Sequence, residues 1–464
     1  MFLIPDGASA KVVLAYEESK GLGKGPGGNH DETVDTTLET VDASQEPAER
    51  EDWGKNIYFH SFDYFAPETI SQGTMINLPE LDENNDPIIT EDGLSYFTLN
   101  ARRVRMLVQP PSNWGKEEVS MVFLYREGAE GHGHPANIIM RRFVGGYGPE
   151  HLECTSRKKH PETKEDICVA GSTNLNEDNR TPEPEGQADA RAHRGFLRGD
   201  NLVVGYTYTE NWGREHIPRY DFFVRRSFDG GKKFTNAAGI KEGPINLSHI
   251  TEEDSPGWSV LEPRLYATPG TLKDALSIND VQNSLVYYAA YSTTHHQSNE
   301  PKDLFWTMTD NFGESYLKQW NDIAKKYEYP WFGKVTDNID GGFAGAQIRT
   351  NPGGTKLFVS YQADVEGAIG AGPCTGNGNA GSDVCSNSTA TFDPLLKRFD
   401  INRDGIVDNE DKNALESHFG FPADDLYDVN GDGVIDAIDV KVWRWGEAEF
   451  AKRGIRRHYL RARH

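Results

Sequence analysis

The fold is decided by the stretch Asp221-Phe-Phe-Val-Arg-Arg226-Ser227-Phe-Asp229-Gly-Gly231-Lys-Lys-Phe234, in which a short apolar strand runs directly into a tight turn. In such a turn the Asp229 carboxylate accepts hydrogen bonds from backbone N–H groups, and Gly231 supplies the turn conformation. The aromatic ring of Phe234 then covers the end of the strand. A looser copy, with one extra residue before its glycine, occurs at Thr309-Asp-Asn-Phe-Gly-Glu-Ser-Tyr316. Two such turns predict a repeated β-unit.

Outward from this turn, a strand that ends in tyrosine recurs at intervals of roughly 70 to 110 residues. Its five copies are Val12–Tyr16, Met121–Tyr125, Leu202–Tyr206, Tyr287–Tyr291 and Leu357–Tyr361. Four copies are followed by a second strand, at Ile57–Phe62, Ile138–Phe143, Asp221–Arg226 and Asp303–Thr307. Four copies are preceded by a segment that contains an arginine, namely Arg105, Arg194, Arg264 and Arg349.

One such unit cannot bury both faces of its sheet, so several must pack around an axis. The sequence therefore predicts a mainly β protein in which residues 1–365 form a β-propeller of about five blades, within a range of four to six. The first copy lacks the arginine segment, and the fifth lacks its outer strands. The turn Ser227-x-Asp229-x-Gly231-x-x-Phe234 resembles the Asp box of sialidase-like propellers, a folding device that implies no reaction.

The four repeated arginines are candidate anion ligands. If their segments are the innermost strands, Arg105, Arg194, Arg264 and Arg349 line the central channel and bind an anion through charge-assisted hydrogen bonds. The alternative is structural, with each arginine paired with an acid such as Glu262 or stacked on a tyrosine. A sialidase site is not indicated, because the nearest match to an Arg-Ile-Pro segment, His216-Ile-Pro218, lacks the arginine.

Two acidic twelve-residue loops near the C-terminus have the pattern of calcium-binding loops. The first runs from Asp400 to Asp411, and the second begins 28 residues later and runs from Asp428 to Asp439. Oxygen atoms at loop positions 1, 3, 5, 7, 9 and 12 suit a hard cation, and glycine at position 6 makes the sharp turn. Two Ca²⁺ ions are expected, with these ligand residues: Asp400, Asn402, Asp404, Ile406, Asp408, Asp411, Asp428, Asn430, Asp432, Val434, Asp436 and Asp439.

Aspartate at position 12 and the 28-residue spacing make residues 392–449 resemble a dockerin, a small α-helical pair of EF-hand loops. The resemblance implies a module that binds a cohesin-type protein partner or clasps a neighbouring domain. Cellulosomal dockerins often carry hydroxyl side chains after position 9, where this chain has Asn409-Glu410 and Ala437-Ile438. The resemblance therefore does not extend to a cellulosomal cohesin as the partner.

Four cysteines form two local pairs, Cys154 with Cys168 and Cys374 with Cys385. A disulfide across each polar loop would stabilise the fold by about 3 kcal/mol and requires an oxidising compartment. A zinc site lacks the Cys-x-x-Cys spacing that supports it. The second pair lies in a Gly- and Ser-rich segment, residues 366–391, which is expected to be a linker or surface loop. Residues 450–464 form a basic tail, either docked on an acidic surface or solvated.

The formal net charge of −24 disfavours nucleic acid and anionic lipid as partners. The longest apolar runs have about eight residues, well below the roughly 20 that span a bilayer. The first residues, Met1 to Asp6, lack the basic segment of a signal peptide. Either the signal has been removed, or the start codon lies inside a longer precursor. The cysteines and the acidic loops nevertheless indicate an extracytoplasmic protein, secreted or held at the cell surface.

Several stretches of the body resemble bacterial exported proteins known as choice-of-anchor O proteins. They are Asn100–Arg105, Glu127–Arg142, Asp189–Gly195, Tyr220–Ser227 and Leu261–Arg264. The resemblance implies an exported protein with an interchangeable C-terminal anchor and implies no reaction. The favoured hypothesis is thus a non-catalytic, calcium-stabilised binding or assembly protein with protein partners, and a glycan is a further candidate ligand. The alternative is a hydrolase that processes a glycan or polyanion with the channel arginines.

Overall fold

The computed structural model describes 21 segments of the chain. They are residues 1–6, 9–19, 55–89, 96–128, 135–177, 187–212, 219–249, 258–267, 286–295, 301–316, 319–321, 326–328, 333–334, 343–350, 356–364, 382–390, 399, 401–402, 407–421, 427–430 and 432–452. The chain divides into two compact units, one formed by Met1–Pro218 with Ser227–Lys233, and the other by Arg219–Arg226 with Phe234–His464.

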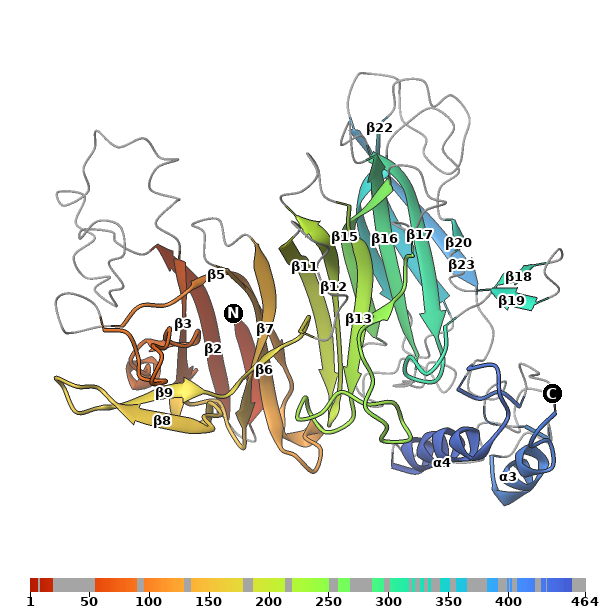
Figure 1. The fold of residues 1–464 in the computed structure, drawn as a ribbon, viewed down its shortest axis with the longest axis horizontal. Coiled ribbons are helices and arrows are strands. Elements are labelled where there is room, and N and C mark those ends of the chain that lie inside the picture. Colours follow the sequence, from red (N-terminus) through yellow and green to blue (C-terminus); the bar gives the residue numbers. More distant parts are fainter. Residues whose placement is uncertain are drawn as a thin grey trace. The chain divides into compact units, whose positions relative to one another are not determined.

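The described chain is mainly β and is built from antiparallel sheets whose strands follow one another in sequence (Figure 1). The first sheet has the order β1 (Phe2–Asp6), β2 (Ser9–Ser19), β3 (Lys55–Asp63), β4 (Thr74–Met75). The second has the order β10 (Ser172–Asn174), β7 (Ala136–Val144), β6 (Val119–Gly128), β5 (Asn100–Val108). The third has the order β11 (Gln187–Arg198), β12 (Asn201–Trp212), β13 (Asp221–Ser227), β14 (Ile245–Asn246).

The remaining sheets continue the same pattern. The fourth has the order β15 (Trp258–Ala267), β16 (Tyr287–His295), β17 (Pro301–Thr309), β20 (Gly333–Lys334). The fifth has the order β21 (Phe343–Thr350), β22 (Lys356–Asp364), β23 (Ser382–Ala390). Two hairpins are separate, β8 (Ser156–Lys159) with β9 (Asp166–Ala170), and β18 (Gln319–Asn321) with β19 (Lys326–Glu328). Three short 3-10 turns are η2 (Pro67–Thr69), η3 (Pro111–Asn113) and η4 (Pro149–His151).

The strands predicted from the sequence occupy fixed places in these sheets. All five tyrosine strands lie in second strands, β2, β6, β12, β16 and β22, and the strands predicted to follow them lie in β3, β7, β13 and β17. The arginine segments form the first strands β5, β11, β15 and β21. The first sheet also has a first strand, β1, which carries no arginine, as predicted.

Neighbouring sheets bury their apolar side chains against each other within each unit. In the first unit Phe59 of β3 packs against Phe123 of β6 and Phe143 of β7, with ring centroids 5.6 and 5.0 Å apart. In the second unit Tyr288 of β16 belongs to one buried cluster with Ile348 of β21. The middle strand β13 is buried along its whole length, and therefore on both faces. Sheets covered on both faces are consistent with propeller blades.

A β-bulge precedes the arginine in the first strands β5, β11 and β15. In β5 the pairing shifts between Arg102 and Arg105, in β11 between Arg191 and Arg194, and in β15 between Leu261 and Arg264. The residue two positions before each arginine has a positive φ, at Arg103 (61°), Ala192 (55°) and Glu262 (51°). A bulge re-aims the side chains that follow it, so these arginines share one local geometry.

The turns after β13 and β17 have the same hydrogen bonds. In the first turn the Gly231 N–H donates to Ser227 Oγ at 2.8 Å, and the Lys233 N–H donates to Asp229 Oδ1 at 2.8 Å. In the second turn the Gly313 N–H donates to Thr309 Oγ1 at 2.8 Å, and the Ser315 N–H donates to the Asn311 side-chain oxygen at 3.0 Å. The second turn therefore has no extra residue, contrary to the sequence interpretation.

In this register Asn311 takes the place of Asp229, and Phe312 takes the place of Gly230. We call the two turns box A (Ser227–Phe234) and box B (Thr309–Tyr316).

An arginine on the preceding sheet supports each box. Arg142 of β7 donates to the Gly230 carbonyl of box A at 3.2 Å and forms an ion pair with Glu153. Arg226 of β13 donates to the Phe312 carbonyl of box B at 3.3 Å and binds both carboxylate oxygens of Glu242 at 2.9 Å. Both arginines are buried. The repeated contact joins each box to the sheet before it.

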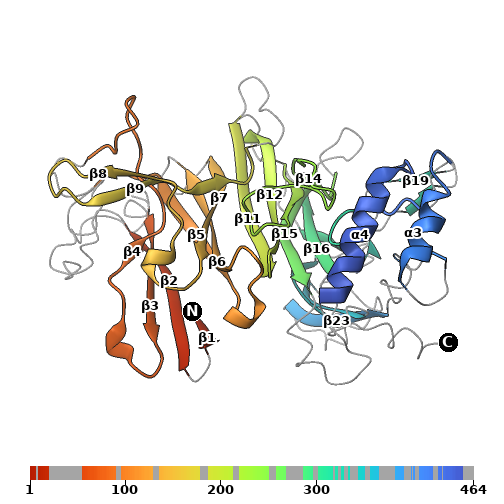
Figure 2. The ribbon, with the colours of Figure 1, turned by 90° about the horizontal axis from the view of Figure 1, so that it is seen from below.

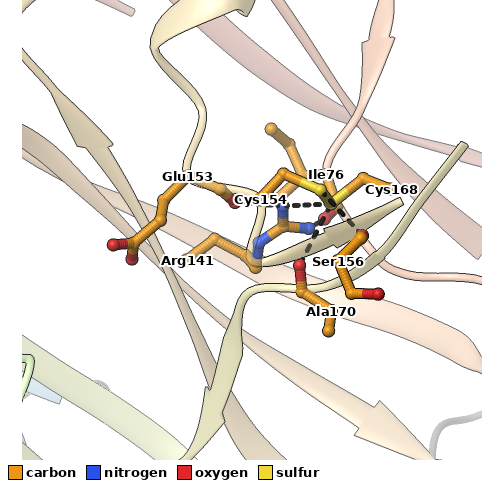
Figure 3. The surroundings of a disulfide bond; sticks show 7 residues. All are labelled: Ile76, Arg141, Glu153, Cys154, Ser156, Cys168 and Ala170. Atoms are coloured by element: carbon orange, nitrogen blue, oxygen red, sulfur yellow. Dashed lines mark hydrogen bonds between the residues drawn. A yellow bond between two sulfur atoms is a disulfide. The ribbon is translucent and has the colours of Figure 1, made fainter. Parts of the chain in front are cut away.

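The predicted disulfide between Cys154 and Cys168 is present and holds the base of the β8–β9 hairpin, with the Cα atoms 5.8 Å apart. Figure 3 shows the neighbouring Arg141 side chain, which donates to the Ile76 carbonyl at 2.6 Å and to the Glu153 carbonyl at 3.0 Å. The hairpin is thereby joined to the first and second sheets. The second predicted disulfide includes Cys374, which lies outside the described residues.

The segment expected to be a linker contributes a strand. β23 pairs antiparallel with β22 over its whole length, so residues 382–390 belong to the fifth sheet and not to a loop. Beyond it, helices α3 (Asn409–Glu416) and α4 (Ala437–Lys452) pack on each other (Figure 2). Each helix begins at position 10 of one acidic loop, and the tail after Lys452 lies outside the described residues.

A prediction for box A follows from its backbone. Gly231 has φ +92°, and a Cβ at this position would lie 2.7 Å from Met140 Cε. Gly231→Ala should therefore lower the free energy of unfolding by about 2 kcal/mol through backbone strain and overpacking. Urea denaturation measures this change. Gly239→Ala is the control, because Gly239 also has a positive φ, 79°, but a Cβ added there would meet nothing within 4 Å. An equal loss of stability in both variants would show that overpacking against Met140 does not add to the backbone strain at Gly231.

Candidate functional site

The four arginines predicted to bind an anion have two kinds of surroundings. In the second unit Arg264 forms an ion pair with Glu262 at 3.5 Å, and Arg349 lies over the Tyr266 ring at 5.2 Å. Burial lowers the pKa of Arg264, and Glu262 opposes this shift. These are the two structural roles that the sequence left open as the alternative. An anion site that uses Arg264 and Arg349 would have to displace both contacts.

In the first unit Arg105 and Arg194 lie near a buried histidine that sequence reasoning missed. His193 is 1 % exposed, and neither of its ring nitrogens makes a hydrogen bond of normal geometry. Burial lowers the pKa of His193 to about 3, and the charges of Arg105, Arg194 and Arg126 add to this shift, against a contribution from the Arg103 backbone. The imidazole is therefore neutral near pH 7.

The acidic loops have matching geometry where both are described. At loop position 12, Asp411 accepts hydrogen bonds from the N–H groups of Asn402 (3.1 Å) and Asp408 (2.7 Å). The corresponding Asp439 accepts from Asn430 (3.1 Å) and Asp436 (2.8 Å). Positions 3 and 9 are thus tied to position 12 in both loops. The aspartates at position 9 also cap α3 and α4, since each accepts from the N–H two residues later.

The second loop also folds around its first residue. The carboxylate oxygens of Asp428 accept from the Asp432 N–H at 3.1 Å and the Gly433 N–H at 3.0 Å. Asp428 and Asp439 are both buried. Burial raises the pKa of Asp439 to about 6 against the hydrogen bonds that it accepts, and the Asp428 charge raises it further. The two buried carboxylates therefore repel each other when both are ionised.

The calcium prediction itself stays a prediction. Within the described part of the chain, no group of three or more His, Cys, Asp or Glu side chains is gathered so that it could hold a metal ion. Three predicted ligands, Asp400, Asp404 and Ile406, lie outside the described residues.

Box B contacts the second acidic loop and α4 through Asn311 and Phe312, where box A has Asp229 and Gly230. The Asn311 side-chain amide donates to the Val429 carbonyl at 2.8 Å, and both residues are buried. The Phe312 ring lies 5.9 Å from the Trp445 ring of α4. An aspartate, as in box A, could not donate this hydrogen bond. A glycine, as in box A, would have no ring to pack.

Phe312 keeps an unfavourable backbone conformation, with φ 58°, at the position where box A has glycine at φ 67°. A bulky residue in the left-handed region costs about 1–2 kcal/mol. Besides Trp445, the Phe312 ring packs against Tyr287 at 6.0 Å. The strained turn is therefore maintained by aromatic packing that includes the C-terminal module.

A buried carboxyl group lies in box B. Glu314 is 3.1 Å from Arg226, its side chain is 2 % exposed, and it accepts a hydrogen bond from the Ala237 N–H at 2.6 Å. Burial raises the pKa of Glu314 to about 7; Arg226 and the Ala237 N–H lower it, and Glu242 raises it. Sequence reasoning missed Arg226 and Glu314, although Arg225-Arg226 repeats the pair Arg141-Arg142 in the equivalent strand.

No family model and no curated protein matches the sequence. Among solved structures, the GH93 α-L-arabinofuranosidase of Fusarium graminearum in complex with arabinobiose has 8 % identity and a TM-score of 0.33, over 67 % of this chain and 69 % of that chain. The polysaccharide lyase Uly1 has 9 % identity and a TM-score of 0.33, over 84 % and 76 %. A variant of Bacillus megaterium levansucrase has 7 % identity and a TM-score of 0.25, over 74 % and 75 %. Likeness at this level carries no argument for an activity.

No helix in the described residues has the length and apolar character needed to cross a bilayer.

Glu314 predicts a dependence of stability on pH. Its pKa is about 7 in the folded protein against a usual 4.5, so between these values the folded state holds a proton that the unfolded state has lost. Stability from this group is complete below pH 4.5 and falls as the pH rises towards 7, by on the order of 2 kcal/mol. Urea denaturation should show that Glu314→Gln loses less stability than the wild type between pH 5 and pH 8. Parallel losses in the two proteins would contradict the assignment.

Proposed function

We propose that this chain is an extracytoplasmic binding or assembly protein in which a five-bladed propeller carries a calcium-binding module fixed to its fourth sheet. The observation that carries the proposal is the pair of contacts made by box B. Asn311 and Phe312 replace Asp229 and Gly230 of box A, and both contact the C-terminal module. A module held in this way presents a defined surface to a partner, instead of moving on a flexible tether.

The propeller follows from the repeat. The third and fourth sheets each start with a bulged strand, and a box follows the third strand of each. An arginine of the preceding sheet donates a hydrogen bond to each box. A contact repeated from one sheet to the next supports a propeller, in which several such sheets pack around an axis. The disulfide between Cys154 and Cys168 supports an oxidising, extracytoplasmic location.

The module is proposed to bind one Ca²⁺ in each loop. Carboxylates at loop positions 1, 5, 9 and 12, an amide oxygen at position 3 and a carbonyl at position 7 form an oxygen-only donor set. The buried and mutually repelling Asp428 and Asp439 support this proposal, because a cation compensates both charges. Protein partners are proposed to bind the calcium-loaded module.

A hydrolase that processes a glycan or polyanion is the second candidate. The arginines near His193 favour it, since Arg105 and Arg194 are placed at corresponding positions of adjacent first strands. Arg105→Gln and Arg194→Gln separate the two candidates when they are tested for turnover of an acidic polysaccharide. Loss of turnover in folded variants would support the enzyme, and purification of the wild type with a stoichiometric protein partner and no turnover would support assembly.

The calcium proposal predicts the stoichiometry of binding. Isothermal titration of the apo-protein should give one Ca²⁺ per loop, and Asp439→Asn should remove the second site while the first remains. At a calcium concentration 100 times the dissociation constant, each site should stabilise the module by about 2.7 kcal/mol. An unchanged stoichiometry in Asp439→Asn would contradict the placement of the second site.

The contact between box B and the module predicts an effect of Asn311→Asp. The variant keeps an oxygen for the Ser315 N–H, as Asp229 does for Lys233, but it loses the donor to Val429 and places a charge against that carbonyl. Limited proteolysis in calcium should therefore cleave residues 392–449 at least several-fold faster, since a lost buried hydrogen bond costs about 1–3 kcal/mol. Asp229→Asn in box A is the matched control and should leave this rate unchanged. Equal rates in both variants would exclude the contact.

A further inference from the structure

The first strands β5, β11, β15 and β21 differ at the residue directly before the repeated arginine. Three strands have an apolar residue there, Val104, Pro263 and Ile348, and β11 has His193. Pro263 and Ile348 are buried, as His193 is. A histidine thus occupies a position that the repeat otherwise fills with apolar side chains. Packing alone does not require an imidazole there.

His193 is a buried polar group whose ring nitrogens have no hydrogen-bond partner of normal geometry. Such a group is costly to fold, and it persists where another function requires it or where a ligand completes its hydrogen bonds. Of the two nitrogens of a neutral imidazole, one donates and the other accepts. A bound oxyanion is an acceptor for the donor nitrogen.

Three guanidinium groups from three strands act on this ring. Arg105 comes from β5, Arg126 from β6 and Arg194 from β11, and the charged side chains that depress the pKa of His193 are all arginines. Arg126 is 8 % exposed, and Arg194 donates to the His193 carbonyl at 2.8 Å, as the repeated arginines of β15 and β21 do to the residue before them. The three arginines therefore act with burial to keep the imidazole of His193 neutral.

Close packing of two sheets brings these residues together. A Cβ at Gly195, the residue after Arg194, would lie 2.7 Å from the Val203 carbonyl and 3.0 Å from Leu107 of β5. Leu124, which pairs with Arg105 across the sheet, would lie 3.3 Å away. Glycine thus allows β11 to approach β5 and β6 at the level of the arginines. The rigid strands on both sides preorganise the cluster.

We propose that Arg105, Arg126, Arg194 and His193 form a binding site for an oxyanion, a sulfate or carboxylate group, either free or carried by an acidic glycan. Arginine binds such groups through two parallel hydrogen bonds, and three positive side chains compensate the desolvation of the anion. The site lies in the first unit and does not involve the calcium module or box B. It uses two of the four repeated arginines and excludes Arg264 and Arg349.

The test is isothermal titration of the full-length chain with sodium sulfate, and separately with a sulfated hexasaccharide, in a buffer of low ionic strength. Arg105→Gln should weaken binding of both probes by roughly tenfold, because it removes one charge-assisted hydrogen-bond pair. Arg349→Gln is the matched control, since Arg349 is also an exposed arginine of a first strand, and it should stay within about twofold of the wild type.

His193→Val tests the histidine, because valine is the residue that β5 carries at this position. The variant should fold at least as well as the wild type and bind sulfate several-fold more weakly. Hexasaccharide binding at least tenfold tighter than sulfate would assign the site to a glycan, and similar affinities would assign it to a free anion. The proposal is overturned if neither probe gives saturable binding, or if Arg105→Gln and Arg349→Gln weaken binding equally.

Discussion

The hydrogen bond from the Asn311 amide to the Val429 carbonyl is the constraint on which this account of the molecule depends. It joins a turn of the fourth sheet to the second acidic loop, and the packing of Phe312 against Trp445 lies beside it. Box A, with the same backbone hydrogen bonds, has an aspartate and a glycine at these two positions. Asn311 and Phe312 therefore make contacts that Asp229 and Gly230 could not make, while the hydrogen bonds of the turn stay the same.

The contact between Asn311 and Val429 affects both box B and the second acidic loop. Arg226 and Glu314 hold box B to the rest of the second unit, and the buried charges make this support sensitive to pH. In the acidic loop, Val429 follows Asp428 and precedes Asn430, so its carbonyl is positioned by two residues predicted to bind calcium. Metal binding and docking are thus expected to stabilise each other, because both need the same loop conformation.

Much of the β-structure could be predicted from the sequence because the tyrosine strands and the arginine strands repeat with apolar patterns. β23 could not, since Ser382–Ala390 is mostly polar and becomes a strand only by pairing with β22. The register of box B was missed because Asp310 suggested the wrong anchor, where the structure uses Asn311. His193 was missed because the bulge that places it depends on a positive φ at Ala192, which has no signal in the sequence.

A double-mutant cycle between Phe312→Gly and Trp445→Ala measures the docking contact most directly. Phe312→Gly gives box B the residue of box A and relieves its backbone strain, so the single variants also separate strain from packing. With calcium present, we expect a coupling energy of about 0.5–1.5 kcal/mol between the two rings in the free energy of unfolding of the module. A coupling energy of zero would show that the module does not dock on box B and would contradict the account.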